Sequence, residues 1–371
     1  MKRILFIVLV VFLASCNQEE KKLKNDIKCE VVNVSQYKSE ILGDISDLYD
    51  SISIIYLNTQ APIGKFEKVI CKQDKIYIHD KNGEKVWVFS NKGDSLICID
   101  KQGKGPDEYI RIEDVSISSD GSINILDASQ KTVLNYDLNG KLQKRNNLHQ
   151  WVHNYFTLKS HEYLFSQTPS EKDGYYLNVL KDSTRIKSYF PSTHIWHFDG
   201  TEFVYSGDSV FFTRYYDDFI YYFKDKNLHK GYFVDFGNSL LFQRKLQEAE
   251  SLEKHKEYLK GKTYTGNIKN LSVSDSHLAF DYSEPFNDWE VVSHFFYNKK
   301  TKNAISIKSF GDSNKDFYSV GFPITSDGHY FYSIIEPWNL EDLQKRKLEE
   351  VIGKPIDENL NCLLCKFILK L

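Results

Sequence analysis

The chain has 371 residues, with 48 Lys and Arg against 51 Asp and Glu, for a formal net charge of −3. This balance argues against nucleic acid as a partner, because phosphate binding needs a basic surface. The 25 Phe and 24 Tyr residues favour pleated sheet, so the composition predicts a mainly β chain.

The first 15 residues have the pattern of a signal peptide. Lys2 and Arg3 precede an unbroken apolar run over residues 4–13, which is shorter than the roughly 20 apolar residues that a membrane-spanning helix needs. The next residues, Leu-Ala-Ser-Cys at 13–16, resemble a bacterial lipobox, in which Cys16 would receive a lipid and become the first mature residue. The alternative is an ordinary signal peptide that happens to carry a cysteine.

The residues after Cys16 are polar and charged, and they offer nothing to bury. We therefore divide the chain into a signal peptide (1–15), a lipidated flexible tether (16–44) and a folded domain (45–371). A lipid on Cys16 would hold the domain in the cell envelope. Asn17, which is not an aspartate, favours the outer membrane, with the domain facing the periplasm or the surface.

Two segments of the folded domain repeat each other at an offset of 47 residues. Each reads as short strands joined by turns, and a unit of this size is typical of a four-stranded propeller blade. In the Asp120-Gly121 pair, the glycine can take the positive φ that a tight hairpin requires. The matched pairs are Ile76 and Ile123, Ile78 and Ile125, Asp80 and Asp127, Phe89 and Tyr136, and Gly93 and Gly140.

Between the two repeats lies Gly-Lys-Gly-Pro-Asp-Glu-Tyr, at residues 103–109. A dinucleotide-binding loop would need a helix after the glycines, so that the helix N-terminus meets the pyrophosphate. Here residues 114–117 begin another strand. We therefore interpret the motif as a turn between blades.

This motif, followed by a strand, an Asp-Gly turn and a second strand, resembles the six-bladed β-propeller lipoproteins of Bacteroidota, which are similar to NHL-repeat propellers. The motif of that family is G-x-G-P-G-E-Y, and Asp107 replaces its usual glycine here. Segments 218–221, 235–237 and 296–301 match as well. The resemblance covers roughly residues 45–371 and implies an all-β, six-bladed β-propeller of four-stranded antiparallel blades. It implies no particular activity, because fold alone does not give function.

The rest of the chain fits the same plan in a more diverged form, with strand-like runs recurring up to residues 363–369. The run 52–57 precedes the first full repeat and could close the ring by pairing with the last blade. Two segments rich in Leu, Glu and Lys, 240–260 and 340–351, predict short helical insertions.

No motif of recognised chemistry stands out. The patterns G-x-S-x-G and H-E-x-x-H are absent, so no catalytic residue is assigned. Cys362 and Cys365 have the spacing of a redox or metal pair, but they lie in a strand-like run without a second ligand pair. We interpret them as buried structural cysteines and expect neither a metal nor a cofactor.

Ligands of propellers usually bind where the loops between blades converge at one end of the ring. Aromatic side chains there stack on sugars or peptides, and arginines pair with carboxylates. For each candidate, packing within a blade is the competing interpretation. The candidate ligand-binding residues are Tyr109, Arg111, Trp151, His153, Trp196 and Arg214.

The sequence thus favours a non-enzymatic envelope module that binds a peptide, a glycan or a partner protein. A propeller hydrolase or lyase acting on a polymer is the alternative. A third interpretation is a scaffold within a membrane complex, which an exposed apolar patch would favour. The expected partners are the membrane, through the lipid, and a ligand of unknown identity.

Overall fold

The computed structural model of the chain describes most of the sequence beyond residue 20. The proposed signal peptide and Cys16 lie outside the described residues, and so does Trp196. The described residues are 21–43, 47–59, 61–149, 151–158, 162–166, 174–181, 184–191, 203–207, 209–214, 216–225, 227–238, 240–247, 252–260, 262–286, 289–310, 321–356 and 362–371.

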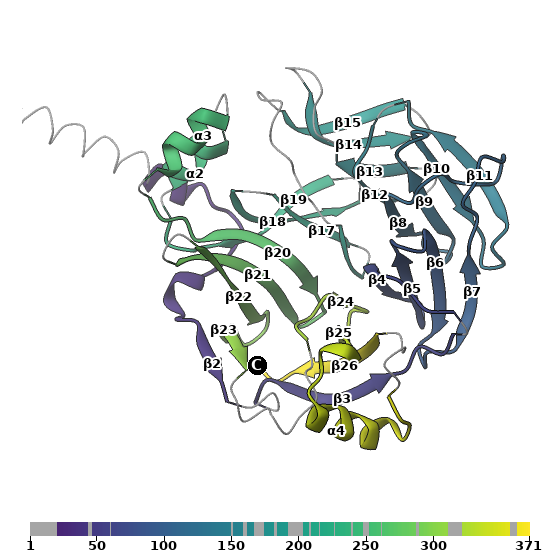
Figure 1. The fold of residues 1–371 in the computed structure, drawn as a ribbon. Helices are drawn as coiled ribbons and strands as arrows, with labels where there is room; N and C mark the ends of the chain where they lie inside the picture. Colours follow the sequence, from purple (N-terminus) through teal and green to yellow (C-terminus); the bar gives the residue numbers. More distant parts are fainter. Residues whose placement is uncertain are drawn as a thin grey trace, which may run out of the picture.

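The described strands pair into six sheets arranged around a common centre (Figure 1). Neighbouring strands along the chain are antiparallel, and the first strand of each sheet lies nearest the centre, where β4, β8, β16, β20 and β24 contact one another. The prediction of an all-β propeller with four-stranded antiparallel blades is therefore confirmed.

The two repeats found in the sequence form the first two sheets of the ring, and their strands occupy corresponding segments of the repeat. The turn glycines Gly93 and Gly140 have φ values of +91° and +70°, which explains why glycine recurs there. The strands are β4 (Phe66–Lys72), β5 (Lys75–Asp80), β6 (Lys85–Ser90), β7 (Ser95–Ile99), β8 (Asp114–Ile117), β9 (Ile123–Asp127), β10 (Thr132–Tyr136) and β11 (Leu142–Asn147).

The next three sheets are more diverged in sequence but keep the same strand order. Their strands are β12 (Asn154–Thr157), β13 (Glu162–Ser166), β14 (Tyr175–Lys181), β15 (Thr184–Pro191), β16 (Val204–Ser206), β17 (Ser209–Arg214), β18 (Asp217–Lys224), β19 (Asn227–Val234), β20 (Gly266–Val273), β21 (His277–Phe286), β22 (Trp289–Asn298) and β23 (Ala304–Phe310).

The last sheet closes the ring by joining the two ends of the folded domain. It contains β24 (Thr325–Ser326), β25 (Phe331–Ile335), β26 (Leu363–Leu369) and, at its outer edge, β3 (Tyr49–Ile55). β3 is antiparallel to β26, and the Tyr49 and Phe367 rings stack with centroids 4.0 Å apart. The prediction that the run 52–57 would close the ring is confirmed.

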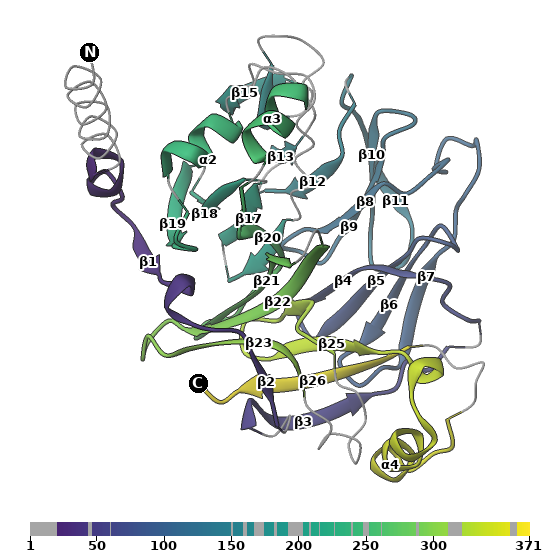
Figure 2. The ribbon, with the colours of Figure 1, turned by 60° about the vertical axis from the view of Figure 1, so that its left-hand side comes forward.

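Residues 30–42, which we call the N-terminal strap, depart from the prediction of a flexible tether over 16–44. β1 (Glu30–Val32) pairs in parallel with β19, and β2 (Glu40–Leu42) pairs in parallel with β23 (Figure 2). Residues before position 45 therefore add strands to two of the sheets. The physical reason is that an exposed sheet edge offers unpaired backbone groups to any nearby extended segment, whatever its side chains.

A cluster of side chains also fixes the strap. The Ser39 hydroxyl donates to the Glu284 carboxylate at 2.5 Å and lies 2.9 Å from the Ser306 hydroxyl. Tyr282 donates to the same carboxylate at 2.7 Å. The strap therefore has its own specific hydrogen bonds in addition to the strand pairing.

The helical insertions lie outside the sheets (Figure 1). Segment 240–260 forms two helices, α2 (Leu240–Gln247) and α3 (Leu252–Leu259), and segment 340–351 forms α4 (Asp342–Ile352). Gly353 ends α4 with a φ of +68°. Two short 3-10 segments are η1 (Val34–Gln36) and η4 (Pro337–Asn339). Within the described residues, no helix is both long and apolar enough to cross a membrane.

The glycine-rich motif at 103–109 connects β7 to β8, as the turn interpretation expected. The Gly105 N–H donates to the Glu108 carboxylate at 2.6 Å, and a Cβ on Gly103 would lie 2.0 Å from that carboxylate. A side chain at position 103 would therefore displace the Glu108 carboxylate, which folds back across the turn. The motif organises a connection between sheets.

Cys362 and Cys365 are both buried at the strand that closes the ring. Burial raises the pKa of each thiol to about 12, so both remain protonated near neutral pH. This placement agrees with the interpretation of structural cysteines.

Candidate functional site

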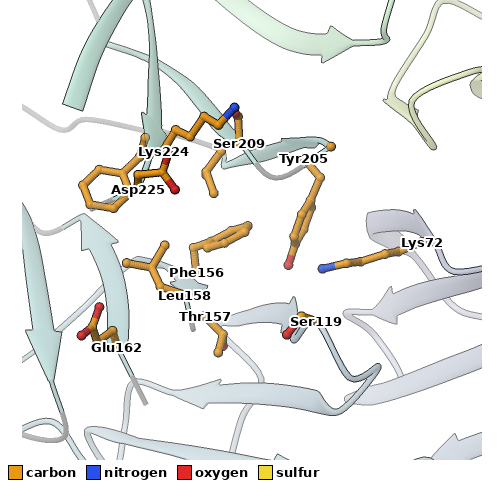
Figure 3. Close-up of a pocket in the computed structure, with 13 residues that line it drawn as sticks. Lys72, Ser119, Phe156, Thr157, Leu158, Glu162, Tyr205, Ser209, Lys224 and Asp225 are labelled. Atoms are coloured by element: carbon orange, nitrogen blue, oxygen red, sulfur yellow. The ribbon is translucent and has the colours of Figure 1, made fainter. Parts of the chain in front are cut away.

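The candidate site is a pocket of about 190 Å³ where the inner hairpins of four consecutive sheets meet (Figure 3). We call it the inner-hairpin pocket. Residues from the β4–β5, β8–β9, β12–β13 and β16–β17 hairpins contribute to it, together with the β18–β19 turn. Its lining residues are Lys72, Ser119, Phe156, Thr157, Leu158, Glu162, Tyr205, Gly207, Ser209, Val210, Phe223, Lys224 and Asp225.

The body of the pocket is apolar. Phe156, Val210 and Phe223 are buried members of one hydrophobic cluster, and Leu158 packs against that cluster. These residues come from alternating positions of strands, which place one face of each strand toward the neighbouring sheet. The pocket is therefore an opening into the core between two sheets.

Tyr205 forms one wall and reaches across to another sheet. Its hydroxyl accepts from the Ile117 N–H at 2.9 Å and donates to the Ile117 carbonyl at 2.8 Å, so β16 is tied to β8. Burial raises the pKa of Tyr205, so the hydroxyl keeps its proton. These two hydrogen bonds fix the position of the Tyr205 ring.

Charged groups surround the apolar body. The Lys72 ammonium lies 4.4 Å from the centre of the Tyr205 ring and donates to the Ile117 carbonyl at 3.1 Å. Lys224 is exposed at the end of β18, on the other side of Tyr205 from Lys72 (Figure 3). Glu162 is only 4% exposed, and Asp225 sits beside Lys224 in a turn with a φ of +48°. The pocket therefore combines an apolar recess with two lysines on opposite sides.

The structure brings three of the predicted ligand-binding residues together, but at the other end of the strands. The Arg111 Nε lies 4.0 Å from a Glu84 oxygen, and His153 Nδ1 lies 4.0 Å from a Glu113 oxygen. The Trp151 ring is 49% exposed and meets the His153 ring edge-on, with centroids 6.4 Å apart. These contacts form an open surface patch.

Tyr109 does not belong to that patch, because its side chain is fully buried. Its hydroxyl donates to the Glu84 carbonyl at 2.7 Å and accepts from the Lys101 N–H at 3.1 Å. The structure therefore gives Tyr109 a structural role. It ties the turn after β7 to the β5–β6 hairpin.

Arg214 lies apart from the other predicted residues, at the end of β17. Its guanidinium is 3.3 Å from the Asp217 carboxylate and lies 4.3 Å from the centre of the Phe190 ring. The five candidates that the structure describes therefore do not form one site.

Sequence reasoning missed the residues of the inner-hairpin pocket. One signal was present, since Lys72 and Ser119 occupy equivalent positions of the two repeats, at the 47-residue offset. Lys72 ends β4 and Ser119 follows the end of β8, so the repeat alone places both at the same end of neighbouring sheets. The contributions of Phe156 and Tyr205 had no such signal, because their blades are too diverged to align.

Comparisons with solved structures support the fold. A protein from Bacteroides fragilis NCTC 9343, assigned as an exported protein, is 17% identical, with a TM-score of 0.73 over 92% of this chain and 100% of that one. A member of the DUF4221 family from Bacteroides vulgatus ATCC 8482 is 13% identical, with a TM-score of 0.50 over 87% of this chain and 97% of that one.

A streptogramin B lyase is more distant, at 10% identity and a TM-score of 0.44 over 88% of this chain and 100% of that one. This likeness is too weak to bear on activity. No functionally curated protein is detectably similar in sequence. The family model described as "Domain of unknown function (DUF4934)" matches residues 29–366, so the chain belongs to the DUF4934 family.

Proposed function

We propose that this protein is an exported, lipid-anchored module of the cell envelope that captures a peptide or protein segment in the inner-hairpin pocket. The six sheets act as blades of one closed ring, and the membrane anchor is the lipid on Cys16. The basic, apolar and lipobox-like segments of the N-terminus support export, and the exported neighbour of the same fold agrees with it.

The observation that carries the proposal is the size and chemistry of the pocket. Pockets for whole small molecules usually measure about 300–1,000 Å³, whereas this one measures about 190 Å³. A recess of this size with Phe156, Val210 and Phe223 in its walls suits a single apolar side chain. Such anchoring by one buried side chain is how many peptide-binding surfaces gain affinity.

The lysines refine the expected ligand. Lys72 and Lys224 lie on either side of the recess, where they would pair with carboxylates that flank the anchoring side chain. Charge pairs at the rim guide binding and set its specificity more than they add affinity. The preferred ligand is therefore a segment with one apolar anchor and neighbouring Asp or Glu residues.

The test is an array of short synthetic peptides, each with a central Phe, Leu or Val flanked by Asp or Glu, by Lys, or by Ser. We expect the acidic set to bind best to the purified full-length protein. Lys72→Gln combined with Lys224→Gln should weaken that binding by about tenfold. Ser209→Trp, which places a large ring in the recess, should abolish it.

The matched control is Lys92→Gln. Lys92 is an exposed lysine on the β6–β7 turn, and it does not line the pocket. Binding that survives Ser209→Trp, or an array without acidic preference, would overturn the proposal. Cleavage of the bound peptides would instead favour the alternative of a propeller hydrolase.

A further inference from the structure

The outer surface of the N-terminal strap carries a large share of the exposed apolar side chains. Among the described residues, twelve large apolar side chains are exposed, and three of them, Val31, Tyr37 and Ile41, lie within the 13 residues of the strap. We propose that this surface, which we call the strap surface, rests on the membrane that holds the lipid of Cys16. The inference rests on the proposed function, because it takes that lipid as the anchor.

The strap is fixed to the ring by its other residues. Val32 and Val34 are buried in a hydrophobic cluster with residues of β19 and β20. The Glu30 carboxylate accepts from the Lys302 ammonium at 2.6 Å and from the Tyr297 hydroxyl at 2.5 Å. The exposed side chains of the strap are therefore held in place before any contact forms, so that binding to a surface does not have to order this segment.

The chain between Cys16 and the ring is short. Leu23 and Ile27 line one cavity with Leu240 and Gln243 of α2, so this part of the chain already lies against the ring. Leu23 is seven positions after Cys16, and a fully extended chain of that length spans at most about 25 Å. A tether free over residues 16–44 would have allowed about 100 Å. A lipid on Cys16 therefore keeps the membrane close to the side of the molecule along which the strap runs (Figure 2).

The residue types of the strap surface suit the boundary between water and lipid. Aliphatic side chains such as Val31 and Ile41 can enter the headgroup region, and a tyrosine ring has an apolar body and a polar tip for the same boundary. Lys28 and Lys38 are exposed, and a lysine can lay its stem on apolar surface while its ammonium reaches lipid phosphates. Glu40 is an exposed carboxylate beside Ile41, so we expect apolar contact, and not net charge, to hold this surface on the membrane.

The experiment uses the acylated protein in phosphatidylcholine vesicles that contain a lipid with a nitroxide on its headgroup. A bimane label is attached to Ile41→Cys or to the matched control Leu96→Cys, each in a background of Cys29→Ser and Cys98→Ser. Leu96 is 51% exposed against 68% for Ile41, and it lies on an outer strand, β7, across the ring from β2 (Figure 1). The nitroxide should quench bimane at position 41 at least about twofold more than at position 96.

Val31→Ser combined with Tyr37→Ser shortens two exposed side chains and leaves Val32 and Val34 in place. This double variant should lower the quenching at position 41 by at least about half. Its binding of acidic peptides should be unchanged, which would show that the ring is intact. Equal quenching at positions 41 and 96, or quenching at position 41 that the double variant does not lower, would overturn the inference.

Two further outcomes separate this inference from other accounts. A dimer of the unacylated protein that the double variant dissociates would assign the strap surface to a second copy of the chain, and would overturn the membrane contact. Mass spectrometry of the N-terminal peptide checks the anchor itself. A chain without a lipid on Cys16 would overturn the proposed anchoring and the strap contact together, whereas an acylated chain with equal quenching at both positions would overturn the strap contact alone.

Discussion

The first two sheets of the ring and the two that follow them are built differently. In β4–β11, which we call the regular half of this four-sheet stretch, the sequence repeats at a fixed offset and the buried cluster is mainly aliphatic. In β9, for example, Ile123, Ile125 and Leu126 are fully buried. In the β12–β19 half, Phe156, Phe203, Phe212 and Phe223 pack together instead. Both the inner-hairpin pocket and a second cavity, lined by residues of β17–β19 and α2, border this second half.

The difference shows how one fold combines a scaffold with binding sites. Small branched side chains interdigitate to the density of a crystal and leave no room for a ligand. Rigid rings in edge-to-face contact, such as Phe203 and Phe212 at 80°, cannot fill every gap between them. We therefore expect the regular half to act mainly as a scaffold and the aromatic half to line most of the inner-hairpin pocket.

The largest expected effect is on the stability of the regular half. Phe89 is fully buried in β6, and Phe89→Ala should lower the free energy of unfolding by about 3–5 kcal/mol, because it leaves a cavity. Urea unfolding would measure this free energy. The control variant Lys92→Gln should stay within about 0.5 kcal/mol of the unchanged protein. The folded variant should keep its affinity for acidic peptides. If Phe89→Ala weakened peptide binding, the regular half would not act only as a scaffold.

The next largest effect is a pH dependence of stability, which arises from His79 in β5 of the regular half. Burial lowers the pKa of His79 from 6.5 to about 4. Between these values the unfolded chain binds a proton at His79 that the folded protein does not. The contribution of His79 to stability therefore falls as the pH drops from 6.5 toward 4, and this contribution changes no further below 4. The loss should be at most about 3 kcal/mol. His79→Gln should flatten the stability profile measured by urea unfolding at each pH, and an unchanged slope would contradict this assignment.

A smaller effect is expected for the turn between the first two sheets. Tyr109→Phe removes the hydroxyl that bonds the Glu84 carbonyl and the Lys101 N–H, which should cost about 1–3 kcal/mol of unfolding free energy. Thermal unfolding followed by circular dichroism would detect it. If Tyr109→Phe left stability unchanged but altered ligand binding, the structural role given to Tyr109 would be wrong.

The smallest effect is expected at the exposed patch of Arg111, Trp151 and His153. Arg111→Gln removes a long pair, at 4.0 Å, from an exposed arginine, so it should change the unfolding free energy by less than about 0.5 kcal/mol. It should also leave peptide binding intact, as measured on the same array. A clear loss of peptide binding in Arg111→Gln would indicate that peptides bind at the exposed patch and not in the inner-hairpin pocket.

Much of the architecture could be predicted because its signals are local. The repeat, the closing run at 52–57, the C-terminal strand at 363–369 and the helices after residues 240 and 340 follow from alternation, turn residues and helix propensity. The residues of the candidate site were harder to predict from the sequence. Tyr109 and Arg111 stand close together in sequence, yet one is buried and the other exposed.

The sequence by itself determined the strands, their grouping into repeated units and the turns between them, because backbone geometry and side-chain period act over a few residues. Tertiary structure alone decided which edges the N-terminal strap would cover and which side chains would meet at the pocket. Ser39 bonds Glu284 across 245 positions, and Tyr205 bonds Ile117 across 88. Such contacts depend on the closure of the ring, which brings distant blades together with no trace in the spacing of residues along the chain.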